Sequence, residues 1–404
     1  MKVLTFSTLF PSSVRPSHGI FVETRLRELL KGGHIESRVV APVPWFPSSN
    51  PRFGEYASYA ATPAREHRNG IDVRHPRYLL APKVGMTSAP LCLALGARAA
   101  VRQLLADGFD FDVIDAHYFY PDGVAAVMLG KALGKPVVIT ARGTDINLIP
   151  QHALPRRMIL NAARDCAAMI TVCAALKDEL VALGADASKV TVLRNGVDLG
   201  LFHPGGRDAA RAEFGIDGYT LASVGHLIPR KGHELVIGAL PQLPDATLLI
   251  AGAGPEEGRL RSLAASLGVE QRTRFLGSLP QQRLRQLYAA ADALVLASSR
   301  EGWANVLLEA MACGTPVVAS NVWGTPEVVA APAAGVLMDE RSAAGVARAV
   351  IQLRAQVPDR SATRRYAEDF GWDPTISGLN LLLADVLANH RARPAAPGGA
   401  HRHA

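Results

Sequence analysis

Short, continuous apolar runs alternate with longer amphipathic segments along most of the 404-residue chain. Apolar runs without an alternating polar face are typical of strands that are buried on both faces of a parallel sheet. Their alternation with helical patterns therefore predicts an α/β fold. In the N-terminal half the predicted strands are Val3–Ser7, Ser37–Val40, Val113–Asp115, Val137–Thr140 and Met169–Val172, and the predicted helices include Gly19–Lys31, Met86–Ala106 and Asp122–Leu133.

The same pattern begins again in the C-terminal half. Its predicted strands are Thr220–Val224, Ala246–Ala251, Thr273–Leu276, Ala293–Ala297 and Pro316–Ala319, with helices at Gly232–Leu240, Glu256–Leu267, Gln281–Ala290 and Asn305–Ala312. We therefore expect two doubly wound domains, 1–197 and 198–373, followed by a helix at 374–390 and a flexible tail at 391–404. Ligands of such sheets bind at the carboxyl ends of the strands, so two facing domains would form a cleft there.

Composition and charge narrow the function classes. The chain is 49% hydrophobic and 20% charged, which favours a large core over disorder. The net charge of +7 lies entirely in residues 1–197, with 23 Lys and Arg against 16 Asp and Glu. Such an excess suits nucleic acid, anionic membrane or phosphorylated ligands. No aromatic-basic motif or recognition helix accompanies it, so we expect no nucleic-acid partner.

Cysteine usage and hydropathy favour a cytoplasmic protein. The four cysteines form no C-x-x-C pair, which argues for buried thiols in a reducing compartment rather than a zinc or redox site. The N-terminal MKVLTFSTLF lacks a cleavage pattern and is expected to be a first strand. The uncharged stretch Val84–Ala97 is shorter than a spanning helix requires. We expect a soluble protein, at most peripheral on a membrane.

The strongest chemical signal is the segment 300–316, REGWANVLLEAMACGTP, which follows the predicted strand Ala293–Ala297. Glu301 lies in the loop and Glu309 lies on the next helix, whose N-terminal amides at Gly302–Asn305 would favour a phosphate. Glu309 is placed to accept hydrogen bonds from vicinal hydroxyls such as those of a ribose. A capping carboxylate and a solvated glutamate are the alternative, but a carboxylate among Leu, Ala and Met needs a partner.

A second signal is the segment 224–232, VGHLIPRKG, which follows the first strand of the second domain and opens a helix. Gly225 allows the backbone to approach a ligand closely, and Arg230 and Lys231 supply positive charge to a diphosphate. A basic loop alone is often only solvated, but here it shares one sheet edge with Glu301.

These residues resemble the retaining glycosyltransferases of family four, which have the GT-B fold of two facing Rossmann-like domains. Glu301 and Glu309 match the family's Glu-x7-Glu pair, whose first member contacts the donor sugar and whose second binds the ribose. Lys231 matches the lysine of the family's Gly-Arg-x-x-x-x-Lys-Gly loop, which contacts the diphosphate. His226 stands where the family has arginine, a departure that bears on diphosphate affinity or donor choice.

Other segments carry the same resemblance. They are RNGVD at 194–198, AGAGPE at 251–256, FLG at 275–277 and WGTPE at 323–327. Together the resemblance implies a nucleotide-diphosphate sugar as donor. The implied donor-binding residues are Gly19, Gly225, His226, Arg230, Lys231, Gly277, Gly302, Trp303, Ala304, Asn305, Val306 and Glu309.

The N-terminal half would supply the acceptor side. Gly19 matches a family glycine near the donor phosphate, and His117 matches a histidine near the donor sugar. We expect His117 to act with Glu301 and Lys231 in catalysis; Asp145 is equally well explained as a helix N-cap. The residues assigned to the acceptor or cleft are His18, Tyr118, Arg142 and Asp145. Segments 8–11, 18–23, 116–123 and 140–147 most resemble a bacterial subgroup of teichuronic-acid and exopolysaccharide biosynthesis.

The resemblance implies transfer with retention from the nucleotide sugar to a hydroxyl of a saccharide or lipid-linked saccharide, by front-face attack in which the departing phosphate deprotonates the acceptor. Lys231, Arg230 and helix N-termini would stabilise the leaving diphosphate, so no metal or other cofactor is expected. Asp110 and Asp112 have Asp-x-Asp spacing, but they precede their strand.

Alternative functions stay open. A sugar-nucleotide epimerase of the same fold would form product from the donor alone, whereas a non-catalytic subunit would bind the donor without turnover. A nicotinamide dehydrogenase would need a G-x-G-x-x-G after the first strand, which 7–19 lacks. Residues 78–96 are apolar and are flanked by Arg77, Lys83 and Arg98, so they suit either an anionic membrane surface or an ordinary packed helix.

Overall fold

The computed structural model describes residues 1–80 and 85–392, which form two compact units. The N-terminal unit combines residues 1–193 with the residues from Pro374 onward, and the C-terminal unit is Arg194–Asp373. The boundary expected at 197/198 therefore falls four residues earlier, and the expected C-terminal helix is part of the N-terminal unit rather than a separate element. The tail expected at 391–404 lies outside the described residues from 393 onward.

The N-terminal unit is built on an eight-stranded sheet in the order β10-β9-β8-β7-β1-β2-β5-β4. Its strands pair in parallel except β4, which runs antiparallel to β5 as a hairpin at the sheet edge. The strands are β1 Lys2–Phe6, β2 Glu36–Val40, β4 Arg65–Arg68, β5 Ile71–Arg74, β7 Val113–His117, β8 Val137–Ala141, β9 Ala168–Thr171 and β10 Val190–Val192, beside a small sheet of β3 Val43–Pro44 and β6 Arg77–Tyr78. The predicted parallel sheet is thus confirmed, with β4, β5 and β10 added.

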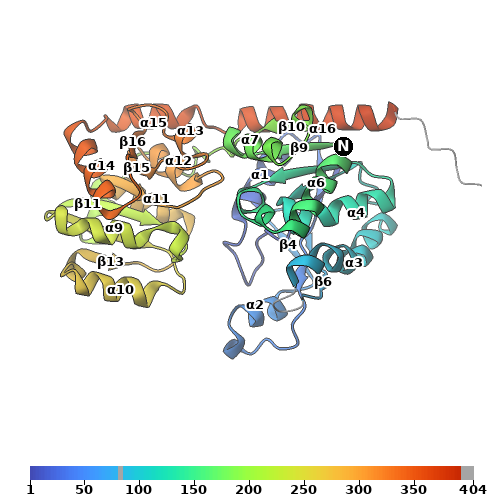
Figure 1. Ribbon diagram of the computed structural model, residues 1–404, viewed down its shortest axis with the longest axis horizontal. Coiled ribbons are helices and arrows are strands. Elements are labelled where there is room, and N and C mark those ends of the chain that lie inside the picture. Colours follow the sequence, from blue (N-terminus) through green and yellow to red (C-terminus); the bar gives the residue numbers. More distant parts are fainter. Residues whose placement is uncertain (81–84, 393–404) are drawn as a thin grey trace, which may run out of the picture. The chain divides into compact units, whose positions relative to one another are not determined.

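Helices cover this sheet. They are α1 Ile20–Leu30, α2 Glu55–Ala61, α3 Gly85–Ala106, α4 Val124–Leu133, α5 Thr144–Asn147, α6 Ala153–Asp165, α7 Ala174–Ala182 and α16 Asp373–Ala392. In Figure 1 the red helix α16 lies along the N-terminal unit. Its Leu379, Leu383 and Val386 are buried in one core cluster with Val3 of β1 and Leu29 of α1, which is why this helix belongs to that unit.

Helix α3 is the only helix among the described residues that is long and apolar enough to cross a membrane, judged by length and composition. The helix predicted at Met86–Ala106 is confirmed as this 22-residue helix, in which Arg98 and Arg102 follow the uncharged stretch that ends at Ala97. Leu93, Ala97 and Val101 are fully buried, and the helix contacts α4. One side of α3 therefore packs in the domain as an ordinary core helix does.

The C-terminal unit is a six-stranded parallel sheet in the order β13-β12-β11-β14-β15-β16. The strands are β11 Tyr219–Val224, β12 Ala246–Ala251, β13 Thr273–Phe275, β14 Ala293–Leu296, β15 Val317–Ser320 and β16 Gly335–Met338. The helices are α8 Arg207–Phe214, α9 His233–Ala239, α10 Glu257–Ser266, α11 Gln281–Ala290, α12 Asn305–Ala312, α13 Thr325–Val328, α14 Ala343–Ala355 and α15 Arg360–Glu368 (Figure 1). All five strands and four helices predicted here are present.

Strand order locates the binding edges. In the C-terminal unit the chain passes from β11 to β12 on one side and later to β14 on the other side of β11. In the N-terminal unit β1 likewise lies between β2 and β7. Helices that cross in opposite directions leave a crevice at such a switch point, outside the carboxyl ends of the two strands. The loops after β11 and β14, and those after β1 and β7, are therefore the candidate site loops.

Candidate functional site

The basic loop after β11 and the acidic loop after β14, both predicted from the sequence, meet at the switch point of the C-terminal unit. β11 and β14 are paired in parallel, so the loops that follow them leave the same sheet edge. The backbone amide of Ser299 donates to the carbonyl of Arg230 at 2.8 Å, which ties the two loops together. The segments around Lys231 and Glu301, 70 residues apart in the chain, are therefore held side by side.

Glu301 is enclosed by cations. Its Oε1 accepts hydrogen bonds from Lys231 Nζ and Ser298 Oγ, both at 2.7 Å, and Arg230 Nη1 lies 3.6 Å from its Oε2. Arg230 Nη1 also donates to the carbonyl of Arg300 at 3.1 Å, which fixes the guanidinium over the loop. Burial opposes the charge of Glu301, but Lys231 and Arg230 outweigh it, so the pKa of this carboxyl is lowered.

Glu309 has a different environment, one turn into α12. Desolvation by burial raises the pKa of its carboxyl to about 7, partly offset by a hydrogen bond from Tyr288 Oη to Glu309 Oε2 at 2.8 Å. Tyr288 is itself fully buried on α11. The partner that a carboxylate among apolar residues needs is therefore a tyrosine, which sequence reasoning missed because it lies 21 residues away on another helix.

Glycines let the loop after β11 lie close to its neighbours. A Cβ on Gly232, whose φ is +72°, would lie 2.0 Å from the carbonyl oxygen of Ala297. Gly225 has φ +152°, another conformation that L side chains rarely adopt. His226 is exposed between them. Gly277 accepts a backbone hydrogen bond from Gly252 at 2.8 Å, which joins the loops after β12 and β13.

Trp303 and its neighbours hold the connecting segment. The Trp303 side chain is buried, and its Nε1 donates to the carbonyl of Asn195 at 3.0 Å. The Asn195 side chain in turn meets Asn305 Oδ1 at 3.3 Å, at the start of α12. Of the predicted donor residues in this stretch, the Trp303 ring thus serves the fold, while Gly302, Ala304 and Val306 surround the helix start.

In the N-terminal unit, Gly19 and His18 follow β1. Gly19 has φ +67°, and a Cβ there would lie 2.3 Å from the carbonyl oxygen of Leu9, so this position requires glycine. His18 Nε2 donates to the carbonyl of Thr8 at 3.1 Å, and its Nδ1 accepts from Arg15 Nη2 at 2.9 Å. Desolvation and the nearby Arg15 charge lower the pKa of His18. The imidazole therefore holds the loop folded in its neutral form.

His117 is buried at the end of β7 with both ring nitrogens engaged. Nε2 lies 3.2 Å from Asp115 Oδ2, and Nδ1 accepts from Arg142 Nη2 at 2.5 Å. Desolvation lowers the pKa of His117 to about 4, against the attraction of Asp115. His117 is therefore a neutral group whose contact with a ligand would need the Arg142 guanidinium to move.

Asp145 serves the backbone. Its carboxylate accepts from the amides of Phe119 at 2.6 Å, Gly143 at 2.7 Å and Arg142 at 3.1 Å. It is fully buried and is the second residue of α5, whose N-cap is Gly143 without a side-chain cap, so the predicted N-cap role is wrong; the carboxylate instead holds the loops after β7 and β8. Between these loops Tyr118 has φ +83°, a strained conformation for a residue with a Cβ.

Two further buried charges were missed from the sequence. Arg25 on α1 donates to Thr140 Oγ1 at 3.0 Å, and its charge attracts Asp115. Asp122 binds the Thr8 amide and hydroxyl, which joins the loops after β1 and β7, and desolvation raises its pKa to about 7. An arginine in an amphipathic helix gives no sign that it points inward.

Within 1–80 and 85–392, no cluster of three or more His, Cys, Asp or Glu could hold a metal ion.

Comparison with known proteins identifies the family. Residues 207–370 match the family described as Glycosyl transferases group 1, and residues 55–201 match Glycosyltransferase Family 4. The chain is 31% identical over 373 residues to D-inositol 3-phosphate glycosyltransferase 1 of Catenulispora acidiphila, an alignment that covers 85% of this chain and 87% of that protein.

The chain belongs to glycosyltransferase family four.

Other relatives match over a shorter stretch. The D-inositol 3-phosphate glycosyltransferase of Mycolicibacterium smegmatis is 36% identical over 229 residues, and the alignment covers 54% of this chain and 53% of that protein. The chain thus spans about half the length of this relative. The Catenulispora alignment covers 85% of this family-four chain and therefore extends into both units.

Solved structures confirm the GT-B fold of this family member. Sucrose-phosphate synthase from Thermosynechococcus elongatus superposes with a TM-score of 0.78 at 19% identity, covering 96% of this chain and 99% of that chain. HepE of Anabaena, solved in complex with UDP-glucose, superposes with a TM-score of 0.72 at 21% identity, covering 96% and 100%. The predicted pair of Rossmann-like domains is confirmed.

Proposed function

We propose that this protein is a metal-independent, retaining glycosyltransferase that moves a sugar from a nucleotide-diphosphate donor to an acceptor hydroxyl. The observation that carries the proposal is the cluster of Lys231, Arg230 and Glu301 at the switch point of the C-terminal sheet. Two cations and one carboxylate there match a ligand that has both a diphosphate and a hydroxylated ring. UDP-glucose bound to HepE of Anabaena supports a donor of this class.

Charge development explains what the cations would do. As the glycosidic bond breaks, the electron pair leaves with the diphosphate, which gains negative charge. Fixed cations already aimed at that position stabilise it without reorganisation and without a bound metal. Lys231 is held 2.7 Å from Glu301 in the structure, so a diphosphate would share or take over this cation. Glu301 would then be released toward the sugar hydroxyls.

Glu309 would bind the ribose of the donor. A carboxylate that accepts hydrogen bonds from two vicinal hydroxyls needs a fixed orientation, and the Tyr288 hydroxyl supplies it by holding one oxygen. The pKa of about 7 means that ribose binding and Glu309 ionisation are coupled near neutral pH. We expect donor affinity to depend on pH between about 6 and 8.

The proposed pathway role is synthesis of a cell-surface or extracellular polysaccharide, with a saccharide or lipid-linked saccharide acceptor. Its support is the resemblance of the loops after β1, β7 and β8 to the teichuronic-acid and exopolysaccharide subgroup. The relatives named D-inositol 3-phosphate glycosyltransferase favour a second candidate acceptor, inositol 3-phosphate. The two acceptors differ in charge, and this makes them separable.

A cytoplasmic protein that meets a lipid-linked acceptor would dock on the membrane. The surface we propose for this is one face of α3, where Leu91 and Leu95 are more than half exposed. The exposed Arg98 and Arg102 follow them on the same face of the helix. Apolar side chains beside arginines fit an anionic lipid surface. Co-sedimentation with anionic vesicles at low salt, lost in Leu91→Glu/Leu95→Glu, tests this proposal; equal sedimentation of both proteins contradicts it.

The decisive experiment screens nucleotide sugars by thermal shift and then measures product with and without acceptors. A bound donor raises the apparent melting temperature. Product that requires an acceptor supports the transferase, whereas isomerised product from donor alone would identify an epimerase. Donor binding without turnover across a panel of acceptors would identify a binding subunit. The anomeric configuration of the product, read by NMR, tests retention, and unchanged rates in excess EDTA test metal independence.

A further inference from the structure

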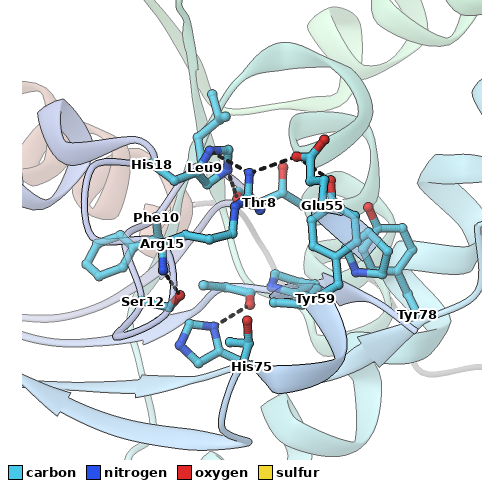
Figure 2. Close-up of a pocket in the computed structure, with 15 residues that line it drawn as sticks. Thr8, Leu9, Phe10, Ser12, Arg15, His18, Glu55, Tyr59, His75 and Tyr78 are labelled. Atoms are coloured by element: carbon cyan, nitrogen blue, oxygen red, sulfur yellow. Dashed lines mark hydrogen bonds and ion pairs between the residues drawn. The ribbon is translucent and has the colours of Figure 1, made fainter. Parts of the chain in front are cut away.

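A cavity of about 200 Å³ lies in the N-terminal unit beside the ends of β1 and β2. Figure 2 shows Arg15 in the cavity between His18 and Glu55, with Tyr59 and Tyr78 on one side. Among these residues only His18 was expected from the sequence to serve a ligand. The volume is below the ~300–1,000 Å³ of pockets for drug-sized ligands and suits a single ring.

Four polar side chains of the cavity, Arg15, His18, Glu55 and Tyr59, form one connected cluster. Arg15 Nη2 lies 3.2 Å from Glu55 Oε1 and 2.9 Å from His18 Nδ1. The Tyr59 hydroxyl donates to the same Glu55 oxygen at 2.7 Å, and the Arg15 guanidinium lies 5.0 Å from the centre of the Tyr59 ring. The cation is therefore held by its partners, and the Glu55 side chain, 63% exposed, forms the rim.

This arrangement discriminates by charge. A phosphate that approaches Arg15 also approaches the Glu55 carboxylate, so repulsion offsets the attraction. A hydroxyl can both donate and accept, so it can donate to Glu55 and accept from Arg15 together. His18 stays uncharged because burial and Arg15 lower its pKa, and it adds no second cation.

The remaining walls are mixed, because Thr8, Ser12, Thr62 and His75 line the cavity together with apolar and aromatic side chains. Phe10, Pro42, Val43 and the Tyr78 ring line the cavity. A sugar ring has the matching shape, with C–H groups on its faces and hydroxyls around its edge. Pockets that combine apolar walls with a few placed polar groups orient such ligands.

We infer that this cavity binds an uncharged, hydroxyl-bearing sugar ring of the acceptor, and that the Arg15–Glu55 pair selects against a phosphorylated ring. The inference rests on the proposed transferase function and narrows its acceptor class. It favours the saccharide over inositol 3-phosphate, because the charge of Arg15 is balanced by Glu55, whereas at the proposed diphosphate site two cations, Arg230 and Lys231, face the single carboxylate of Glu301.

Binding to the full chain tests this without turnover. The probes are two matched pairs, methyl glucoside with glucose 6-phosphate and myo-inositol with inositol 3-phosphate, measured by calorimetry or saturation-transfer NMR in the presence of UDP. We expect the uncharged member of at least one pair to bind about tenfold more tightly than its phosphate. Glu55→Gln keeps the shape and removes the charge, so the uncharged ring should lose about tenfold and the preference should move toward the phosphate.

Matched variants keep the test sharp. Glu36→Gln changes another exposed glutamate of the same unit and should leave both affinities unchanged. Tyr59→Phe keeps the aromatic wall and frees Glu55 from its hydrogen bond, so a smaller loss in the same direction is expected. Equal or tighter binding of the phosphates by the unmodified protein, no binding of any probe, or an unchanged preference in Glu55→Gln overturns the inference.

The readouts also separate this inference from the proposed function. If sugar transfer occurs and Glu55→Gln leaves the acceptor KM unchanged, the pocket assignment fails while the transferase stands. If the uncharged ring binds as expected but no donor yields an acceptor-dependent product, the transferase fails while the pocket stands.

Discussion

Replacing Lys231 by methionine tests whether the loops after β11 and β14 are held by the Lys231–Glu301 pair. The substitution removes the ammonium group and leaves an unbranched apolar side chain of similar length. Glu301, with only 9% of its side chain exposed, then keeps Ser298 at 2.7 Å and Arg230 at 3.6 Å as partners. A buried carboxylate loses its closest counter-charge, which is the situation in which ion-pair removal costs most.

The distances set the size of the effect. Coulomb's law at an effective dielectric constant of about 20 gives ~6 kcal/mol for unit charges 2.7 Å apart, before the desolvation of both groups is subtracted. Breaking a buried pair on one side costs about 3–5 kcal/mol. Because Arg230 remains, we expect Lys231→Met to lower the free energy of unfolding by about 3 kcal/mol. In the double variant Lys231→Met/Glu301→Gln no buried charge is left unpaired, so the total loss should be only about 1 kcal/mol.

Urea unfolding followed by tryptophan fluorescence measures these values, since three of the four tryptophans lie in the C-terminal unit. In the unmodified protein the pKa of Glu301 lies below its unfolded value, so the pair stabilises the fold above the unfolded pKa and loses this effect as the pH falls through the folded pKa. In Lys231→Met the pKa of Glu301 rises. The difference between the two proteins should therefore narrow from pH 8 to pH 4.

A matched control is Lys135→Met, because Lys135 also lies 2.7 Å from a carboxylate, that of Asp110, whose side chain is 74% exposed. The stability should hardly change there, since an exposed pair contributes little. Equal losses in Lys231→Met and in the double variant, or a loss as small as the control's, would refute the reasoning that Glu301 is a buried carboxylate held by this lysine.

Three further predictions follow from the same contacts. Between pH 5 and pH 8 the free energy of unfolding of Glu309→Gln should rise by about 2–4 kcal/mol relative to that of the unmodified protein. The reason is that a folded pKa of about 7 makes the native state lose stability as Glu309 ionises. Parallel pH profiles of the two proteins in urea unfolding would contradict this. Gly19→Ala should lower stability by about 2 kcal/mol or more through the clash with Leu9, whereas Gly33→Ala, with φ +70° and open space around it, should cost only about 1 kcal/mol. His117, with a pKa of about 4, should remain neutral by NMR down to about pH 5 and should reduce stability as the pH falls from about 6.5 toward 4; a ring that titrates near 6.5 would exclude the buried arrangement.

Regular elements were predictable wherever one local pattern decided them. β12 and α11 match their predicted bounds, because an apolar run and a helical period are each contained in the element itself. β4 was missed because Arg65–Arg68 consists of charged and polar residues, and β10 was missed because Val190–Val192 is only three residues long. They become strands only through pairing with a neighbour that the pattern does not reveal.

The candidate site was predictable as far as loop positions go. Lys231 and Glu301 could be placed at one sheet edge because each follows a predicted strand of the same parallel sheet, and they lie in contact. The groups that tune them could not, since Tyr288 reaches Glu309 from another helix. For Trp303 the sequence suggested a ligand contact that its side chain does not serve. It lies in the segment 300–316, yet its indole binds Asn195 in the segment that joins the two units.

Helix α16 has a consequence for how the chain is made. The C-terminal unit is one continuous stretch, so it is complete on the ribosome before the last residues of α16 are synthesised. The core of the N-terminal unit is incomplete until α16 has been synthesised, since Leu379, Leu383 and Val386 pack in one cluster with its first strand. Although it is translated first, it is finished last, and until then the apolar surface around Val3 and Leu29 is available to chaperones rather than to its own helix.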